Sequence, residues 1–195
     1  LRYYDINQVS NLQAGTYEVV LRALKAGPGS YRFVVQDAAA LPVFALGQVT
    51  DASVSQASWG RAWQFDAAAG QHLIIDPSTS YYPTSYWTLV GPQGESVASG
   101  SNYYYNDNSR RVTLPTAGRY VLYTRGDSNA TGARNMTLDV SAYNEPVTPI
   151  QLGDQISGRI AGRGDINHYT FTLDTDTTIV LDARGGAANV KLTGP

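Results

Sequence analysis

The sequence predicts an all-β protein made of tandem antiparallel β-sandwich repeats of about 105 residues, of jelly-roll-like or immunoglobulin-like kind. Three observations predict this fold class. Apolar residues alternate with polar ones along short segments, clusters of Gly, Pro, Asn and Asp separate these segments, and the chain aligns with itself at a shift of slightly more than 100 residues. Alternation with a period of two is typical of half-buried strands, whereas an amphipathic helix has a period of 3.6 residues.

The front of the repeat emerges when residues 46–76 are aligned with residues 152–182, a shift of 106 without a gap. The matched positions include a glycine and several apolar residues that are expected to face the core. They are Gly47 with Gly153, Val54 with Ile160, Trp63 with Tyr169, Phe65 with Phe171, Leu73 with Ile179, and Ile75 with Leu181. A three-residue deletion then aligns residues 89–92 with residues 192–195. A fixed period of this kind indicates a repeat architecture.

The back of the repeat aligns at a shift of 103, which places residues 12–21 on residues 115–124 and Tyr17 on Tyr120. After two residues of slippage, three alternating residues match as well. They are Tyr31, Phe33 and Val35, which fall on Met136, Leu138 and Val140.

The chain therefore divides into three parts. Residues 1–42 form the C-terminal half of one repeat, residues 43–146 a complete repeat, and residues 147–195 the N-terminal half of the next. Each half alone would leave an apolar sheet face and unpaired strand edges exposed, which favours association. We expect either that the polypeptide continues at both ends or that halves from successive chains combine head to tail.

Within the complete repeat, alternating apolar residues mark the strands in order. They occur around residues 63–65, 73–75, 87–89, 112–114, 120–122 and 136–140. Turn-forming residues lie between them, near residue 70 and at residues 91–96, 106–109, 115–118 and 125–132. Seven or eight short strands in about 100 residues fit a two-sheet antiparallel sandwich, and the pattern leaves the jelly-roll and immunoglobulin-like alternatives open.

The segment "GRGDINHYTFTL" at residues 162–173 resembles the signature that opens the bacterial pre-peptidase C-terminal domain. The apolar strand, Gly-Pro turn and Ala-Gly-x-Tyr strand that follow in that family resemble "LIID", "LVGPQGE" and "AGRYVLY" here. The sequence departs from the family at Asn167, where an Asp is usual, and at residues 58–65, which lack the acidic pattern. The resemblance implies a jelly-roll-like sandwich, found on secreted proteases or in tandem in large surface proteins. It also implies that relatives bind collagen or polysaccharide through exposed tyrosines and with help from calcium.

Composition and net charge exclude several classes of function. The formal net charge of -2 leaves no electrostatic footprint for nucleic acid or an anionic membrane, and no apolar run is long enough to insert into a bilayer. The sequence contains no cysteine, which excludes disulfides, thiol catalysis and cysteine-ligated zinc. Together with loops rich in Ser, Thr, Asn and Gly, this composition favours a bacterial extracellular or cell-surface location.

Tyrosines gather in two segments that are expected to be loops or to border them, "STSYYPTSYW" and "SNYYYNDN". The candidate ligand-binding residues are Tyr81, Tyr82, Tyr86, Tyr103, Tyr104 and Tyr105. Exposed tyrosine offers a wide, rigid contact surface at low entropic cost, which suits polysaccharide or an extracellular-matrix protein. The alternative is ordinary strand alternation, in which every second tyrosine enters the core.

Two Arg-Gly-Asp tripeptides are candidates for integrin-type recognition, which requires a protruding loop. The first comprises Arg125, Gly126 and Asp127 and is expected in a hairpin loop, and the second begins at Arg163. The alternative is that Gly-Asp is simply favourable turn chemistry, and short motifs of this kind often match without function.

Several oxygen-bearing side chains of the last segment form a loose candidate calcium set, namely Asp165, Asn167, Asp174 and Asp176. Calcium prefers such ligands, but the spacing matches no known calcium loop. Turn-capping carboxylates are the alternative interpretation, and calcium is the one candidate cofactor.

No catalytic motif stands out. His72 and His168 lie on expected strands at positions where the paired repeat has no histidine, and no local motif brings them a nucleophile or a metal partner. His168 is expected to face solvent because it alternates with the apolar Tyr169.

These observations predict a non-catalytic structural or adhesive repeat of a large bacterial extracellular or cell-surface protein, assembling as an array or fibre with neighbouring repeats or other copies. Proline in the connectors "AALPVFALG" and "NEPVTPIQLG" would stiffen the spacing between units. The alternative is a carbohydrate- or collagen-binding accessory module of a secreted hydrolase that uses the tyrosine loops.

Overall fold

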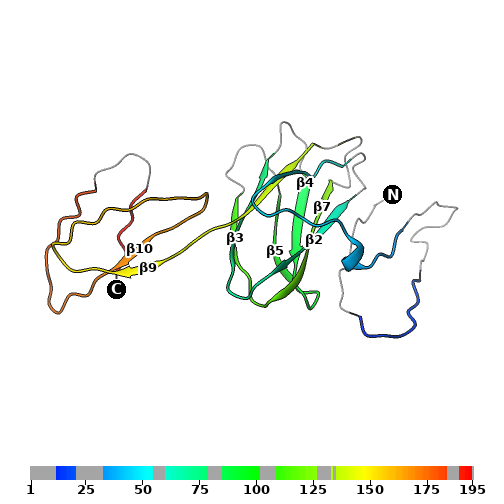
Figure 1. Ribbon diagram of the computed structural model, residues 1–195, viewed down its shortest axis with the longest axis horizontal. Helices are drawn as coiled ribbons and strands as arrows, with labels where there is room; N and C mark the ends of the chain where they lie inside the picture. Colours follow the sequence, from blue (N-terminus) through cyan, green and yellow to red (C-terminus); the bar gives the residue numbers. More distant parts are fainter. Residues whose placement is uncertain are drawn as a thin grey trace, which may run out of the picture.

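The structure is a computed structural model of the 195-residue chain. It describes residues 12–20, 33–54, 60–78, 85–101, 109–126, 133, 135–183 and 189–194. Figure 1 shows a β-sandwich in the middle of the molecule and an extended segment at each end of its long axis. No α-helix is present among the described residues, which confirms the all-β class.

Among the described residues, eight strands build the sandwich as two four-stranded antiparallel sheets. The first sheet has the order β1 (Val49–Asp51), β8 (Thr137–Ala142), β3 (His72–Ser78), β6 (Arg110–Thr113). The second has the order β2 (Arg61–Ala67), β7 (Gly118–Gly126), β4 (Ser85–Val90), β5 (Ser96–Ser101). A short 3₁₀ turn, η1 (Ala38–Ala40), precedes the sandwich, and β9 (Val147–Pro149) and β10 (His168–Thr170) follow it.

The strand pairing is that of a jelly roll. β4 pairs with β5, β3 with β6, β2 with β7 and β1 with β8, so the chain forms one long antiparallel hairpin that is rolled into two sheets. Two further pairings, β4 with β7 and β3 with β8, close the sheets. This order decides between the two alternatives that the sequence left open, in favour of the jelly roll.

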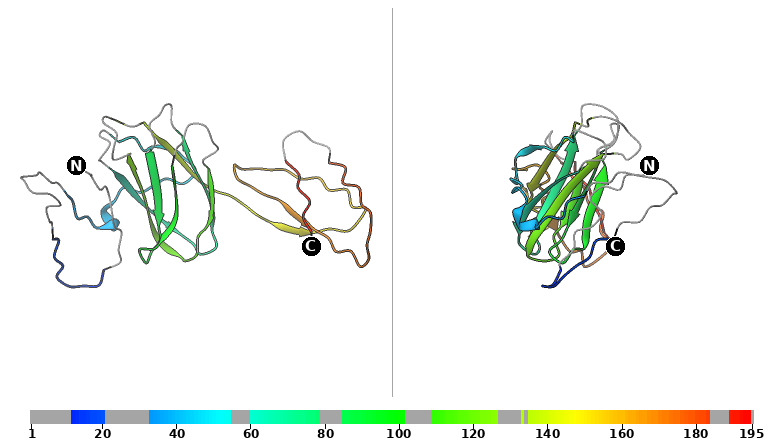
Figure 2. Two further views of the ribbon diagram at one scale, coloured as in Figure 1. Left: turned by 180° about the vertical axis from the view of Figure 1, so that it is seen from behind. Right: turned by 90° about the vertical axis from the view of Figure 1, so that its right-hand side faces the viewer.

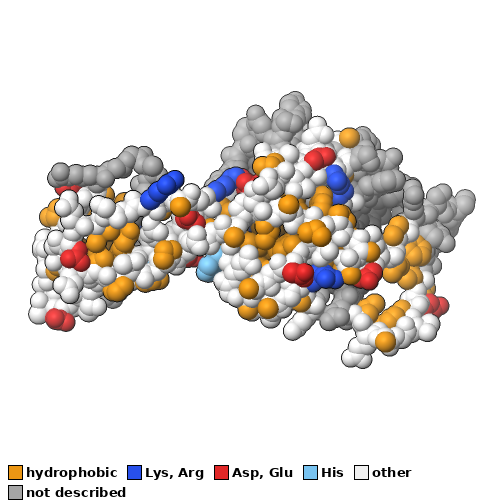
Figure 3. Space-filling view, in the orientation of Figure 1, with side chains coloured by type: hydrophobic (Ala, Val, Ile, Leu, Met, Phe, Trp, Pro, Cys, Tyr) orange, Lys and Arg blue, Asp and Glu red, His pale blue; other side chains and the backbone are white. Residues whose placement is uncertain are grey.

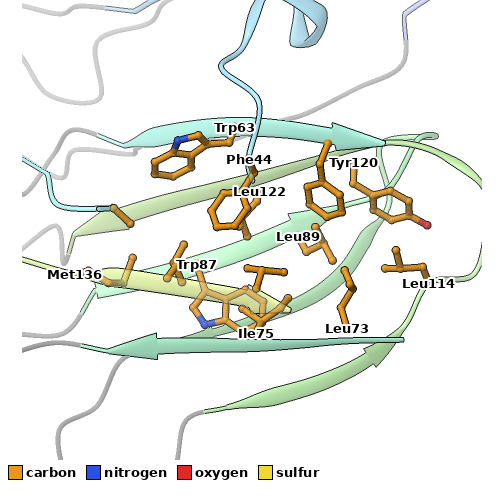
Figure 4. Close-up of a cluster of buried hydrophobic side chains, with 14 residues drawn as sticks. Phe44, Trp63, Leu73, Ile75, Trp87, Leu89, Leu114, Tyr120, Leu122 and Met136 are labelled. Atoms are coloured by element: carbon orange, nitrogen blue, oxygen red, sulfur yellow. The ribbon is translucent and has the colours of Figure 1, made fainter. Parts of the chain in front are cut away.

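The core lies between the two sheets and is formed by the alternating residues that the sequence marked. Figure 4 shows Trp63, Trp87 and Tyr120 among aliphatic side chains from both layers, and all three rings are buried. The rings of Phe65 and Tyr120 are stacked with centroids 5.8 Å apart, and Phe44 meets Trp63 edge-on at 5.9 Å. Burial of one such side chain stabilises a fold by about 1.5–3 kcal/mol, so this cluster is the main source of sandwich stability.

One glycine is required by the core. Gly100 lies opposite Trp87 in the β4–β5 pairing, and the indole ring packs against its backbone. A Cβ atom on Gly100 would lie 2.9 Å from ring atoms of Trp87. The Trp87 indole therefore fits because its cross-strand neighbour has no side chain.

The described residues of the two end segments do not form a sandwich. In residues 147–183 and 189–194 the described pairing is one short parallel pair, β9 with β10, and residues 12–20 contain no strand. Figure 3 shows hydrophobic side chains at the surface of both segments. The structure thus shows one domain-sized sandwich, with an apolar but open segment at each end.

A backbone contact of the sandwich recurs in the C-terminal segment at positions that the shift of 106 pairs. The Phe44 N–H donates to the carbonyl of Gln64 at 2.8 Å, and the Ile150 N–H donates to the carbonyl of Thr170 at 2.9 Å. Both contacts belong to a short parallel pairing of the connector with the following strand.

A side-chain contact recurs in the N-terminal segment at positions that the shift of 103 pairs. The Tyr120 O–H donates to the carbonyl of Thr116 at 2.6 Å, and the Tyr17 O–H donates to the carbonyl of Gln13 at 2.7 Å. Each end segment therefore keeps a local geometry of the sandwich without its tertiary packing.

Candidate functional site

Of the six candidate tyrosines, the structure describes one, Tyr86. Tyr86 lies in β4, on the outer face of the second sheet, and is half-buried. Tyr81, Tyr82, Tyr103, Tyr104 and Tyr105 lie outside the described residues.

Tyr86 is paired with an arginine. It lies opposite Arg125 of β7, and the Arg125 guanidinium carbon is 4.4 Å from the centroid of the tyrosine ring. A cation held over an aromatic face at this distance is attracted by the ring quadrupole. The contact fixes both side chains against the sheet and leaves a mixed aromatic and cationic surface.

A second tyrosine of this surface was not predicted. Tyr123 lies two residues before Arg125 on the same face of β7, opposite Thr88 of β4, and is half-buried. Ser99 and Ser101 of β5 extend the same face. We call this surface the tyrosine face, comprising Tyr86, Thr88, Ser99, Ser101, Tyr123 and Arg125. Tyr123 alternates with the buried Leu122 and Thr124, and the pairing of β7 with β4 brings it beside Tyr86.

The first Arg-Gly-Asp tripeptide does not begin in a loop, so the expected hairpin position is wrong for its first two residues. Arg125 and Gly126 are the last residues of β7, and Gly126 is buried opposite Ser85. The strand continues further than the turn residues indicated because β7 pairs with β4 along its whole end. Asp127 lies outside the described residues.

The second tripeptide attaches the C-terminal segment to the sandwich. The Arg163 guanidinium forms ion pairs with Asp76 of β3 and with Asp139 of β8, the latter at 3.2 Å. Gly164 has a positive φ of 86°, and a Cβ atom there would lie 3.1 Å from Ile74. These residues form a junction between the sandwich and the segment that follows it.

Asp165 completes this junction through backbone hydrogen bonds. Its carboxylate accepts from the backbone N–H of Asn144 at 2.8 Å and from that of Gly162 at 2.7 Å. These hydrogen bonds hold the pKa of the Asp165 carboxyl below its ordinary value, because they favour the charged form.

The candidate calcium residues are not brought together into a recognisable site. Asp165 is engaged in the junction, and the Asn167 side-chain amide donates to the carbonyl of Arg159 at 3.3 Å. Asp174 and Asp176 are exposed. Across the part of the chain that the structure describes, no group of three His, Asp or Glu side chains is arranged to hold a metal ion.

Both histidines meet one carboxylate at the junction. Glu145 lies 2.8 Å from His168 Nε2 and 3.9 Å from His72 Nδ1, and His72 Nδ1 also contacts Thr113 Oγ1 at 2.9 Å. His168 is exposed as expected, but Tyr169 is exposed as well, so the two residues do not alternate between core and solvent here. Burial raises the pKa of the neighbouring Tyr143 phenol, and the Glu145 carboxylate raises it further. Tyr143 and Glu145 lie two residues apart, whereas His72, Thr113 and His168 come from separate segments that no local pattern links to Glu145.

The rolled hairpin, its closed core and the open end segments define the chain as a jelly-roll β-sandwich protein. None of the described residues belongs to a helix long and apolar enough to cross a membrane. No family model and no curated protein matches the chain.

Solved structures match over 52% of the chain. One is the pre-peptidase C-terminal domain of collagenase from Bacillus anthracis, at 18% identity and a TM-score of 0.42 over 94% of that chain. Others are PliG, a periplasmic inhibitor of g-type lysozyme, from Aeromonas hydrophila (16%, 0.41, 94%) and from Salmonella Typhimurium (17%, 0.39, 96%). The family that the sequence motifs resemble is thus among the matching structures. The assignment to the jelly-roll class rests on the strand pairing described above and not on these likenesses.

Proposed function

We propose that the chain is a non-catalytic structural or adhesive repeat of a large bacterial extracellular or cell-surface protein, which assembles as an array or fibre. One observation carries the proposal. A complete sandwich is flanked at both ends by segments whose apolar residues match its core positions and lie exposed. Apolar surface of this extent on a water-exposed protein marks an interaction site.

The junction supports an array with a defined spacing. Arg163 and Asp165 attach the C-terminal segment to β3, β8 and the backbone of Asn144, so successive units would have a preferred orientation. The absence of cysteine and the polar loops of the sequence suit an extracellular protein whose stability comes from repeated packing.

Negative-stain electron microscopy of the purified chain at increasing concentration tests this function. Strings of sandwich-sized particles with regular spacing are expected. Isolated particles at every concentration, together with a monomeric mass in solution, would contradict it.

A second candidate function is binding of polysaccharide or collagen through the tyrosine face. The observation that favours it is the Tyr86–Arg125 contact beside Tyr123, since an aromatic surface flanked by hydroxyls and a cation suits a sugar ring or a peptide. A glycan and collagen array would compare the wild-type chain with Tyr86→Ala and Tyr123→Ala. Arg119→Ala is the matched control, because Arg119 is exposed at the other end of β7. Loss of a bound ligand in the tyrosine variants alone supports this function, and no ligand for the wild-type chain counts against it.

A further inference from the structure

The hydrogen-bonded strand pairs of the jelly roll divide its eight strands into two halves, β1 to β4 and β5 to β8. No two of the strands β1 to β4 are hydrogen-bonded to each other, and no two of β5 to β8 are. Every pairing in the sandwich joins one strand of the first half to one strand of the second. A chain cut between β4 and β5 therefore yields two arms, neither of which can form a sheet alone, because all ladder partners lie in the other arm.

The two end segments correspond to these two arms. Residues 147–194 align with the region of β1 to β4, and residues 12–20 and 33–36 align with β7 and β8. We call them the C-terminal arm and the N-terminal arm. The central strands of the two sheets are β8, β3, β7 and β4, and each of them has its counterpart in one of the two arms.

The N-terminal arm exposes the residues that its counterpart buries. Val19 and Val35 are 56% and 77% exposed, whereas the paired Leu122 and Val140 are fully buried. Tyr17 keeps the hydrogen bond of Tyr120 yet is also exposed. The arm thus has the local geometry and the apolar face of β7 and β8 but no sheet around them.

The C-terminal arm has the same property. Leu181 and Leu192 are 59% and 55% exposed, whereas the paired Ile75 and Leu89 are fully buried. Further pairs of exposed and buried residues are Tyr169 with Trp63 and Val190 with Trp87. The face that would cover the N-terminal arm is therefore present and open.

The two arms of one chain lie at opposite ends of the sandwich, as Figure 1 and the left view of Figure 2 show with the long axis horizontal. The junction of Arg163 with Asp76 and Asp139 holds the start of the C-terminal arm at its own end. Closure of the arms on each other within one chain is disfavoured by this arrangement. A second copy of the chain carries both complementary arms and is therefore a partner that fits each of them.

We propose that the N-terminal arm of one copy inserts into the C-terminal arm of a second copy and completes a jelly roll between chains. The inserted strands take the positions of β7, between β2-like and β4-like strands, and of β8, between β1-like and β3-like strands. The contact is heterologous, so it propagates head to tail. This inference rests on the proposed array function and names its partner and its bonding.

The test uses two variants of the full chain, each blocked at one arm. Val19→Asp with Val35→Asp blocks the N-terminal arm, and Leu181→Asp with Leu192→Asp blocks the C-terminal arm. In sedimentation velocity the wild-type mass should rise with concentration above 21.0 kDa, and each blocked variant alone should stay monomeric. An equimolar mixture of the two should form a heterodimer and nothing larger, because one intact arm of each kind remains.

Matched controls separate the inserted face from mere hydrophobicity. Val34→Asp changes a neighbouring residue that is 78% exposed and pairs with Asp139, which already faces outward. Thr172→Asp pairs with the exposed Asp66 of β2. Both controls should assemble as the wild type does. Fluorescence of Trp63 and Trp87 verifies that the central sandwich stays folded, since every changed residue lies outside it.

A disulfide tests the register. In the sandwich Gln64 lies opposite Val121, and the paired arm residues are Thr170 and Glu18. A mixture of Glu18→Cys and Thr170→Cys chains should cross-link upon oxidation, because opposed residues of an antiparallel pair lie within disulfide range. A mixture of Glu18→Cys and Asp174→Cys chains should not cross-link, because the sandwich residue that aligns with Asp174 lies beyond the ladder of β2 and β7.

Several outcomes would overturn the proposal. They are a wild-type chain that stays monomeric, a blocked variant that still assembles alone, and equal cross-linking of both cysteine mixtures. If strings form but the blocked variants form them too, the array function stands and strand insertion is overturned. If the wild type forms neither strings nor larger species, both proposals are overturned.

Discussion

At the scale of single residues, the core depends on a missing side chain as much as on the large ones. The Trp87 indole occupies the space over Gly100, where a Cβ atom would lie 2.9 Å from the ring. Backbone and indole cannot both stay in place if that atom is added, because interiors are close-packed.

Gly100→Ala is therefore expected to destabilise the sandwich by about 1–3 kcal/mol, the usual cost of overpacking. Chemical denaturation followed by tryptophan fluorescence measures the change. Ser99→Ala is the matched control, because Ser99 is exposed on the outer face of the same strand and should leave the midpoint unchanged. An unchanged midpoint for Gly100→Ala would mean that the indole does not pack there.

Asp165 makes the junction dependent on pH. The pKa of its carboxyl is lowered by backbone hydrogen bonds from Asn144 and Gly162, so the charged form is favoured in the folded chain. A carboxyl of this kind contributes stability above its ordinary pKa of 3.8, and that contribution is lost as the pH falls through the lower folded value. Amide exchange of Asn144 and Gly162, corrected for its intrinsic pH dependence, should show less protection at such acidic pH.

The same loss should appear at neutral pH in Asp165→Ala, which removes the acceptor. Asp174→Ala is the control, because Asp174 is an exposed aspartate of the same segment that takes no part in the junction. Protection that is equal in the wild type and Asp165→Ala would contradict the assigned role of the carboxylate.

Much of the core could be predicted at this scale, and the junction could not. Alternation placed Trp63, Phe65 and Leu122 inward because a strand directs successive side chains to opposite faces. The partners of Arg163 lie 87 and 24 residues away in the sequence, and no period connects them.

At the scale of elements, the ion pairs between Arg163 and two neighbouring strands set the direction of the C-terminal arm. Its two ion pairs join β3 and β8 to the segment after β9. Exposed ion pairs contribute about 0–1 kcal/mol each, so their effect is on orientation more than on folding.

Arg163→Gln is accordingly expected to leave the melting temperature of the sandwich nearly unchanged and to broaden the range of arm orientations. Small-angle X-ray scattering of the blocked, monomeric variant measures the maximum dimension and its spread. Arg159→Gln, which changes an arginine of the same segment, is the control. If the scattering curve of Arg163→Gln is identical to that of the blocked variant without this substitution, the ion pairs of Arg163 do not orient the arm.

The order of the strands lay beyond prediction for a physical reason. A period of two tells which residues of a strand face inward but not which strand lies beside it, since ladder partners are far apart in the chain. The jelly roll and the immunoglobulin fold therefore share one pattern until the pairing is known. For the same reason Tyr123 could not be assigned to the surface of Tyr86, although both strands were predicted.

At the scale of the whole molecule, the chain contains one closed folding unit and two open arms. Residues 43–146 include every strand of the sandwich and all of its core cluster. A unit of this kind has the cooperative core that two-state unfolding requires.

Residues 43–146 produced alone should therefore fold, unfold in one transition and remain monomeric at concentrations where the full chain assembles. Calorimetry and sedimentation measure the two properties. Assembly of this fragment equal to that of the full chain would place the association surface on the sandwich rather than on the arms.

The central claim is that the exposed apolar faces of the arms are core faces awaiting a second copy. Hydrogen exchange at Val19 and Leu181 tests it most directly, because inserted strands form ladders that protect backbone amides. Protection at both positions should rise together with protein concentration. In the variant that carries both Val19→Asp and Val35→Asp, the amide of Leu181 should stay unprotected. Arms that exchange freely at every concentration, while the sandwich stays protected, would contradict the account.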